Sequence, residues 1–110
     1  MIYQHPRAIS KKEAEELFNH SESEIICDTL VSIAFYESDW KWVQDKCLFY
    51  LNNDDSTIRG LAATCLGHVA RIHGKLEKDN VILALTKHIN EEYVGGRVID
   101  ALEDIRMALG

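Results

Sequence analysis

The sequence predicts an all-α protein, an α-solenoid of three stacked helical hairpins with about six helices. Three observations predict this class: apolar residues recur at helical spacing, turn formers separate the helical segments, and one helical pattern returns every 36 residues. The pattern is clearest at residues 51–71, LNNDDSTIRGLAATCLGHVAR. A single hairpin cannot bury its own apolar face, so about three stacked units are the expected minimum.

The pattern is best read from the helix expected at about residues 56–73. Its apolar side, on one face of a 3.6-residue helix, consists of Ile58, Ala62, Cys65, Leu66 and Val69. Asp55 or Ser56 is expected to cap its start, and Gly74 suits a left-handed C-terminal position. Gly60 and Gly67 lack side chains, which predicts that another backbone lies close to this helix.

Copies of this pattern lie 36 positions away on both sides. The forward copy places apolar or glycine residues at Val94, Gly96, Val98, Ile99, Leu102 and Ile105. The backward copy places apolar residues at Ile26, Cys27, Leu30 and Ile33. We therefore expect Leu30, Leu66 and Leu102 to align within a shared interior.

The expected organisation is one domain, in which a short arm precedes the repeats. The segments are the domain at 1–110, the N-terminal arm at 1–9 and repeats at 10–38, 39–74 and 75–110. In repeat one, capping-box patterns at Ser10 with Glu13 and at Ser21 with Glu24 each predict a helix start. The second of these helices is expected to run to about Ser38.

Repeats two and three show the same alternation of caps and apolar faces. Asp39 is expected to cap a helix that runs to about Leu51. Asp79 is expected to open the next helix, whose apolar side extends to Ile89. Residues 90–92 then form the turn before the last helix, which ends at Gly110.

The net charge limits the classes of partner. The formal charge is -6 at pH 7 and the sequence pI is near 5.3, so the phosphates of nucleic acids and anionic membranes would repel the chain. No apolar run reaches membrane-spanning length, and Met1 to Ser10 lacks the apolar core of a signal peptide. We expect a cytoplasmic protein with a basic protein partner and no direct contact with nucleic acid or membrane.

The sequence offers no arrangement typical of catalysis or metal binding. It contains no nucleophile motif, phosphate loop or dinucleotide fingerprint. His68 and His73 are five residues apart and so lie on different helix faces, while Cys65 and His68 read as a buried thiol beside a surface imidazole. Cys27 and Cys47 are likewise expected to be buried thiols in a reducing compartment. We expect no enzyme activity, no catalytic residue, no metal and no other cofactor.

The middle repeat resembles a known family. The residues that carry the resemblance to the second half of a HEAT repeat are Asp55, Arg59, Ala62, Ala63, Leu66 and Gly67. Repeat three places Arg97 one position later than the family arginine, and repeat one has neither the arginine nor the glycine. The resemblance implies a right-handed solenoid in which Arg59 supports the turn acids Asp54 or Asp55.

The repeat also predicts a surface. Residues 36 apart on the second helices should form three rows along one face: Asp28, Thr64 and Asp100; Ser32, His68 and Asp104; and Phe35, Arg71 and Met107. These positions fall opposite the apolar side of the helix and are therefore expected outside the core. With Tyr36 beside Phe35, the face combines acids for steering with apolar anchors, which suits a protein partner. An ordinary solvated face remains the alternative.

A second resemblance suggests the kind of partner. Small acidic chains with the signature GLAATCLGHVARIHG are similar to bacterial immunity proteins of contact-dependent growth inhibition and related polymorphic toxin systems. The resemblance implies an inhibitor that covers a cognate toxin, expected to be a nuclease with a basic cleft. The alternatives are a HEAT-like adaptor or regulatory subunit of an endogenous enzyme or assembly, and a lyase-type or chaperone-like helper. The oligomeric state stays open.

Overall fold

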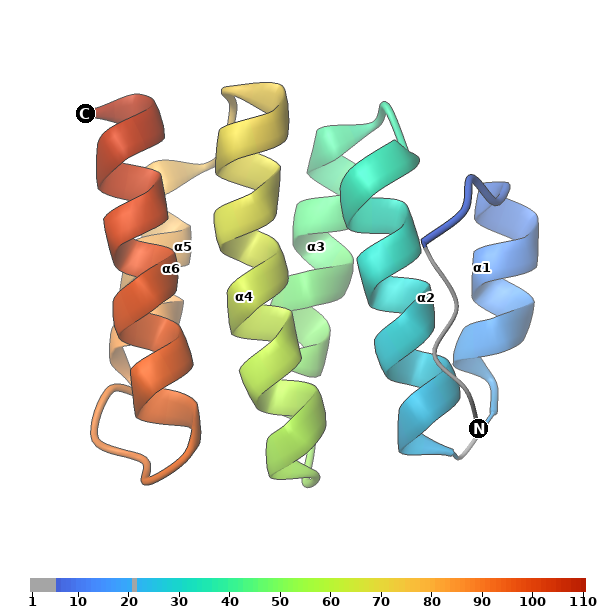
Figure 1. The fold of residues 1–110 in the computed structure, drawn as a ribbon, viewed down its shortest axis with the longest axis horizontal. Helices are drawn as coiled ribbons and strands as arrows, with labels where there is room; N and C mark the ends of the chain where they lie inside the picture. The colour runs from blue at the N-terminus through green and yellow to red at the C-terminus, as the bar shows by residue number, and fades with distance from the viewer. Residues whose placement is uncertain (1–5, 21) are drawn as a thin grey trace.

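The computed structural model describes residues 6–20 and 22–110, and over these ranges it is helical without strands. The helices are α1 (Lys11–Phe18), α2 (Ser23–Tyr36), α3 (Trp40–Tyr50), α4 (Ser56–His73), α5 (Lys78–Thr86) and α6 (Val94–Leu109) (Figure 1). The all-helical class is therefore confirmed. None of these helices is both long enough and apolar enough to span a membrane.

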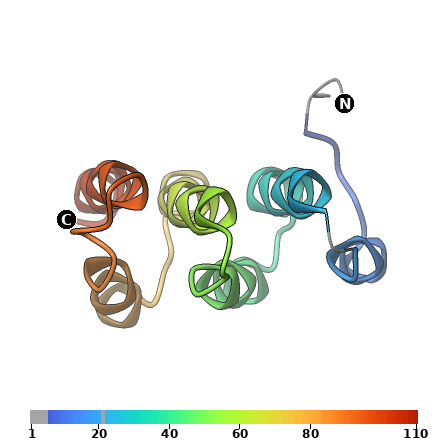
Figure 2. The same ribbon diagram turned by 90° about the horizontal axis from the view of Figure 1, so that it is seen from below.

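The helices form two layers. Seen end on, α2, α4 and α6 lie side by side in one layer, and α1, α3 and α5 lie in the other (Figure 2). The central helix is α4, which packs against α2, α3 and α6. It can do so because its flanks carry small residues: a Cβ added to Gly67 would lie 3.3 Å from the Cα of Ala101 on α6. The close backbone predicted from the glycines is thus present at Gly67, whereas the neighbours of Gly60 are the side chains of Tyr93 and Arg97.

Local capping sets most helix boundaries where the sequence predicts them. The Ser10 hydroxyl accepts a hydrogen bond from the Glu13 backbone N–H at 3.0 Å, and Asp39 accepts one from the Trp42 N–H at 3.2 Å. Asp55 caps α4 by accepting from the Thr57 N–H at 2.8 Å. Gly74 ends α4 with φ 64°, in the left-handed region.

Two boundaries differ from expectation. The cap residue of α2 is Glu22, which makes no side-chain capping bond, and the predicted cap Ser21 lies outside the described residues. The helix α5 begins before Asp79 and ends at Thr86, so Ile89 lies in the following turn. After Thr86 the chain tightens into hydrogen bonds three residues apart, the first from the His88 N–H to the Leu85 carbonyl.

The core runs through both layers, but the last repeat is less enclosed than the middle one. Leu30 and Leu66 are fully buried, whereas Leu102 packs against the core and stays partly exposed. Ile99 is 55% exposed, although its counterpart Ala63 is buried. The reason is position: α6 stands at the end of its layer, with no helix beyond it (Figure 1). Burial there differs from what the 36-residue correspondence predicts.

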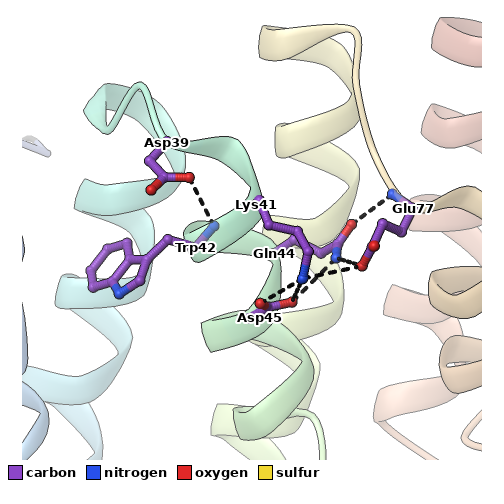
Figure 3. A network of polar contacts seen from close by, with 6 residues as sticks. All are labelled: Asp39, Lys41, Trp42, Gln44, Asp45 and Glu77. Atoms are coloured by element: carbon purple, nitrogen blue, oxygen red, sulfur yellow. Dashed lines mark hydrogen bonds and ion pairs between the residues drawn. The ribbon is translucent and has the colours of Figure 1, made fainter.

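A buried amide joins the second hairpin to the third. Gln44 on α3 is 0% exposed, and its side chain accepts a hydrogen bond from the Glu77 N–H and donates one to the Glu77 carboxylate, each at 2.7 Å. Lys41 lies outside this pair, 3.4 Å from the Glu77 carboxylate and 2.8 Å from that of Asp45 (Figure 3). Both hydrogen-bonding groups of the Gln44 amide are thus satisfied by one residue at the start of α5.

Arg59 links two turns, with acceptors other than the turn acids that the HEAT resemblance implies. Its guanidinium donates to the backbone carbonyls of Asn53 and Asp54 at 2.8 and 2.9 Å and pairs with the Glu91 carboxylate at 2.9 Å. His88 and Arg59 together hold the pKa of Glu91 below its usual value. Asp55 is engaged elsewhere, as the cap of α4 and as the acceptor for Ser23.

We therefore expect Arg59→Lys to lower the free energy of unfolding by about 1–2 kcal/mol, because an ammonium cannot reach both carbonyls and the carboxylate at once. Arg106→Lys is the matched control, since Arg106 makes only exposed contacts with Glu103. It should change the free energy by less than about 0.5 kcal/mol in the same urea titration. Equal effects of the two substitutions would contradict the role assigned to Arg59.

Candidate partner-binding face

Nine of the ten predicted face residues are exposed or partly exposed side chains of α2, α4 and α6, and we take them together as one candidate surface. We call this surface the α2–α4–α6 face, and its residues are Asp28, Phe35, Tyr36, Thr64, His68, Arg71, Asp100, Asp104 and Met107. All are exposed or partly exposed, and Figure 1 views their layer from the front. The face is therefore accessible to a large partner.

Ser32 does not belong to this face, contrary to expectation. Its side chain is buried, with 8% of its surface exposed, and Thr29 one turn earlier is buried as well. Packing explains the difference, because α2 contacts both α1 and α4. These two neighbours leave α2 a narrower outward stripe than a helical wheel of α2 alone predicts.

Side chains from the C-terminal halves of three helices, α2, α4 and α6, meet on the face. The ring of Phe35 on α2 lies 5.0 Å from the ring of His68 on α4, measured between centroids. His68 Nδ1 contacts the guanidinium of Arg71, whose Nε lies 3.6 Å from the Asp104 carboxylate on α6. The second and third predicted rows are thus joined into one chain of contacts.

In the first predicted row, Thr64 is contacted by a residue that the sequence reasoning left out of the face. Arg97 donates to the Thr64 hydroxyl at 3.2 Å and to the Tyr93 hydroxyl at 3.2 Å, and it stacks over the Tyr93 ring. Tyr93 in turn fills the space above Gly60. The sequence feature that could have pointed to Arg97 is its position, one residue later than the arginine of the HEAT pattern. Asp28 and Asp100 lie at opposite ends of this row.

Charge on the face alternates between helices. The acids lie on the flanking helices, as Asp28 on α2 and as Asp100 and Asp104 on α6, whereas α4 contains no acidic residue and contributes Arg71. Partial burial and the nearby Glu24 raise the pKa of Asp28 above its usual value. Because Arg71 lies next to Asp104, the exposed carboxylate of Asp100 is better placed to attract a basic partner.

His68 makes the molecule sensitive to pH. Partial burial, together with the neighbouring Arg71, lowers the pKa of His68, against a smaller opposing effect of Asp104. Protonation therefore costs more in the folded chain than in the unfolded chain, so the stability that His68 contributes is present above about pH 6.5 and lost below it. We expect His68→Gln to reduce the fall in unfolding free energy between about pH 7 and pH 5, as measured by urea titration. An unchanged pH profile would contradict this.

The three thiols and the histidines of the described ranges do not come together as a set of candidate metal ligands. A hydrogen-bonding contact with Cys47, together with burial, raises the pKa of Cys65, and burial raises the pKa of Cys27 to about 11, so these thiols stay protonated and unreactive. Cys65 faces the core while His68 faces outward, so the two do not converge on one ligand. Within residues 6–20 and 22–110, no group of three or more His, Cys, Asp or Glu side chains has the geometry to hold a metal ion.

A second surface feature lies on the opposite layer, between α1 and α3. It is a groove of about 580 Å³ lined by the aromatic rings of Phe18, Trp42, Phe49 and Tyr50 and by Glu15, Asn19, Asp45 and Lys46. The ammonium of Lys46 lies 2.7 Å from the Glu15 carboxylate and over the rings of Phe18 and Trp42. Two of the charged groups that line this groove, Glu15 and Lys46, are therefore paired with each other, and the third, Asp45, is paired with Lys41.

Comparison with known proteins gives a structural match and no match by sequence family. No protein-family model matches the sequence, and no curated protein matches it either. A chain in the crystal structure of a CDI complex from Cupriavidus taiwanensis LMG 19424 superposes with a TM-score of 0.84 at 33% sequence identity. The match covers 97% of this chain and 96% of that one. The two chains belong to one family. CDI denotes contact-dependent growth inhibition, and the CDI-complex chain is part of a complex, so the family includes a protein that assembles with a partner.

Proposed function

We propose that this protein is an immunity protein: it binds the cognate toxin of a contact-dependent growth inhibition system and neutralises it by covering part of its surface. The observation that carries the proposal is the likeness to the CDI-complex chain over nearly the whole length of both chains. The function requires a stable surface and no catalysis.

We propose the α2–α4–α6 face as the binding surface. It spans three helices, so a rigid partner can contact all of them at once. It combines flanking aspartates with the exposed apolar side chains of Phe35, Tyr36 and Met107. Apolar anchors supply affinity, and peripheral charges accelerate encounter and select the partner.

The overall charge suggests the toxin's class. A nuclease needs a basic cleft to hold a polyanion, and a protein with net charge -6 is attracted to such a cleft. We therefore propose a nuclease toxin whose basic cleft is covered. Association should then slow as salt rises, because ions screen the attraction between exposed charges.

Co-purification from the native host tests the function directly. Capture of a toxin domain, followed by loss of its toxicity when this protein is added in equal amount, is the expected result. Capture of a metabolic enzyme or an assembly factor in its place would favour the HEAT-like adaptor. A captured toxin that stays fully active while bound would also overturn the proposal.

Charge reversal tests the face. The double variant Asp28→Lys with Asp100→Lys should weaken toxin binding by about tenfold or more, mainly through a slower association rate. The matched control is Glu16→Lys with Asp79→Lys, which reverses two exposed acids on α1 and α5. Each reversal adds two charges, so both double variants move from -6 to -2. Asp104 is left intact because it contacts Arg71.

The control separates the explanations. If both variants weaken binding equally, bulk charge is responsible and the face is wrong. If neither does, and Phe49→Ala in the α1–α3 groove weakens binding instead, the toxin occupies the opposite layer. Binding would be measured by biolayer interferometry at two salt concentrations. Long-range electrostatic attraction, which salt screens, is then distinguished from direct contacts, which salt affects less.

A further inference from the structure

Arg71 lies in the last turn of α4, which is the middle helix of its layer (Figure 1). The 36-residue correspondence puts Arg71 in one row with Phe35 of α2 and Met107 of α6, which lie near the C-terminal ends of the flanking helices. Its side chain is 49% exposed, while Phe35 and Met107 are 39% and 74% exposed. A half-exposed cation between two exposed apolar side chains is the composition typical of an interface anchor with a water-excluding surround.

The guanidinium is held in place by neighbours on two helices. His68 contacts Nη2 through Nδ1, and the imidazole is itself fixed against the ring of Phe35. On the other side, Asp104 lies 3.6 Å from Nε, which is too long for a strong hydrogen bond. Among the described residues, Nη1 has no acceptor in hydrogen-bonding range. The group is thus oriented and retains donors that point to solvent.

We propose that Arg71 is the recognition residue of this face and that it binds a carboxylate of the toxin, with Phe35 and Met107 contacting apolar surface around that carboxylate. The inference rests on the proposed function and adds the chemistry of the contact. A guanidinium matches a carboxylate through two parallel hydrogen bonds, and apolar flanks that exclude water strengthen such a pair. Nuclease clefts place carboxylates among their cations, because general bases and metal ligands are commonly Asp or Glu.

The pattern on the face is complementary to such a cleft. Asp104 of α6 lies beside the arginine of α4, and Asp28 and Asp100 belong to the row of Thr64, about two helical turns away, so a partner with a carboxylate near cations matches the face. A neutral His68 is part of the arrangement, because Nδ1 can accept a hydrogen bond from Arg71 only when the imidazole is uncharged. Asp104 is the charged group that faces this pair from α6, and Phe35 is the uncharged group that faces it from α2.

A fragment titration tests the site without the toxin. The sequence has two methionines, Met1 and Met107, so a methyl-labelled sample gives one internal reporter beside Arg71. Phenylacetate carries a carboxylate and an apolar ring, whereas phenylacetamide has the same shape without charge. We expect phenylacetate to shift the Met107 methyl signal with half-saturation at roughly millimolar concentration, and phenylacetamide to shift it at least about fivefold less.

Two glutamine variants complete the test. Arg71→Gln should reduce the phenylacetate shift to the level of phenylacetamide. Arg106→Gln, which changes an arginine on α6 whose side chain is 69% exposed against 49% for Arg71, should leave the shift unchanged. Arg71→Lys should give an intermediate shift, because the charge remains and the planar fork is lost. Spectra without ligand establish that each variant is folded. A Met107 shift that persists in Arg71→Gln, or that phenylacetamide matches, overturns the inference.

Failure of this inference is distinguishable from failure of the proposed function. With the captured toxin, Arg71→Gln should weaken binding by about tenfold or more, while Arg106→Gln should not. Capture of an inhibited toxin together with unchanged affinity of Arg71→Gln would remove Arg71 as the recognition residue and leave the immunity function intact. If phenylacetate failed to shift the Met107 signal while the toxin was still captured and inhibited, Arg71 would likewise be removed as the recognition residue and the immunity function would stand.

Discussion

Gly95→Ala is expected to lower the free energy of unfolding by about 3 kcal/mol or more, the largest effect of any exposed or buried glycine. A Cβ added to Gly95 would lie 2.3 Å from the backbone carbonyl oxygen of Ile89 and 3.2 Å from its carbon. The obstacle is backbone and cannot rotate away. Relief would require movement of the 87–93 turn, to which Gly95 is also tied by its N–H bond to the Glu91 carbonyl at 2.8 Å.

The adjacent residue supplies the matched control for this prediction. A Cβ added to Gly96 meets nothing within 4 Å. Gly96→Ala should therefore raise the unfolding free energy by about 0.5–1 kcal/mol, because alanine is the better helix former and loses less backbone entropy. Urea titrations of the two variants would be compared with the parent. Equal free energies of unfolding for Gly95→Ala and Gly96→Ala would show that the turn at residues 87–93 can move to accommodate the added Cβ.

Gln44→Leu is expected to lower the unfolding free energy by about 2–4 kcal/mol. Leucine has a similar volume, so the loss comes from the hydrogen bonds more than from a cavity. It would leave the Glu77 N–H and carboxylate without the amide that satisfies both of them (Figure 3). Because Gln44 connects α3 with the start of α5, the third hairpin should lose amide-exchange protection first.

Glu77→Gln provides the control for this contact. It keeps an oxygen that can accept from Gln44 and leaves the backbone N–H in place, so it removes only the exposed attraction to Lys41. The change in unfolding free energy should stay below about 1 kcal/mol. If the Gln44→Leu and Glu77→Gln variants had the same free energy of unfolding, water would have to replace the hydrogen bonds of the amide at this site.

Much of the local structure could be predicted because it depends on neighbours within a turn or two. Ser10, Asp39 and Asp55 cap helices through backbone N–H groups two or three residues away, and Gly74 ends α4 with its own left-handed backbone. The all-helical class followed from spacing alone. The early end of α5 was missed because residues 87–93 form a tight turn packed against Gly95, a contact across the hairpin.

The candidate site was predicted less completely. The 36-residue rows placed His68, Arg71 and Asp104 on one side of their helices, and the structure brings these three together. Arg97 was left out of the face because its role depends on a hydrogen bond to Thr64 on α4, and spacing within α6 does not reveal a contact between helices. The partners of Arg59 were also different, since main-chain carbonyls leave no mark in the sequence.

The sequence by itself determined the helices, most of their caps and the order of acids, arginine and apolar side chains along one surface. Only the tertiary structure decided which of those side chains water or a partner can reach. Ser32 is covered and Ile99 is uncovered although both belong to the same repeating pattern. The physical reason is that spacing along one helix decides which way a side chain points, whereas its burial depends on whether another helix lies beside it.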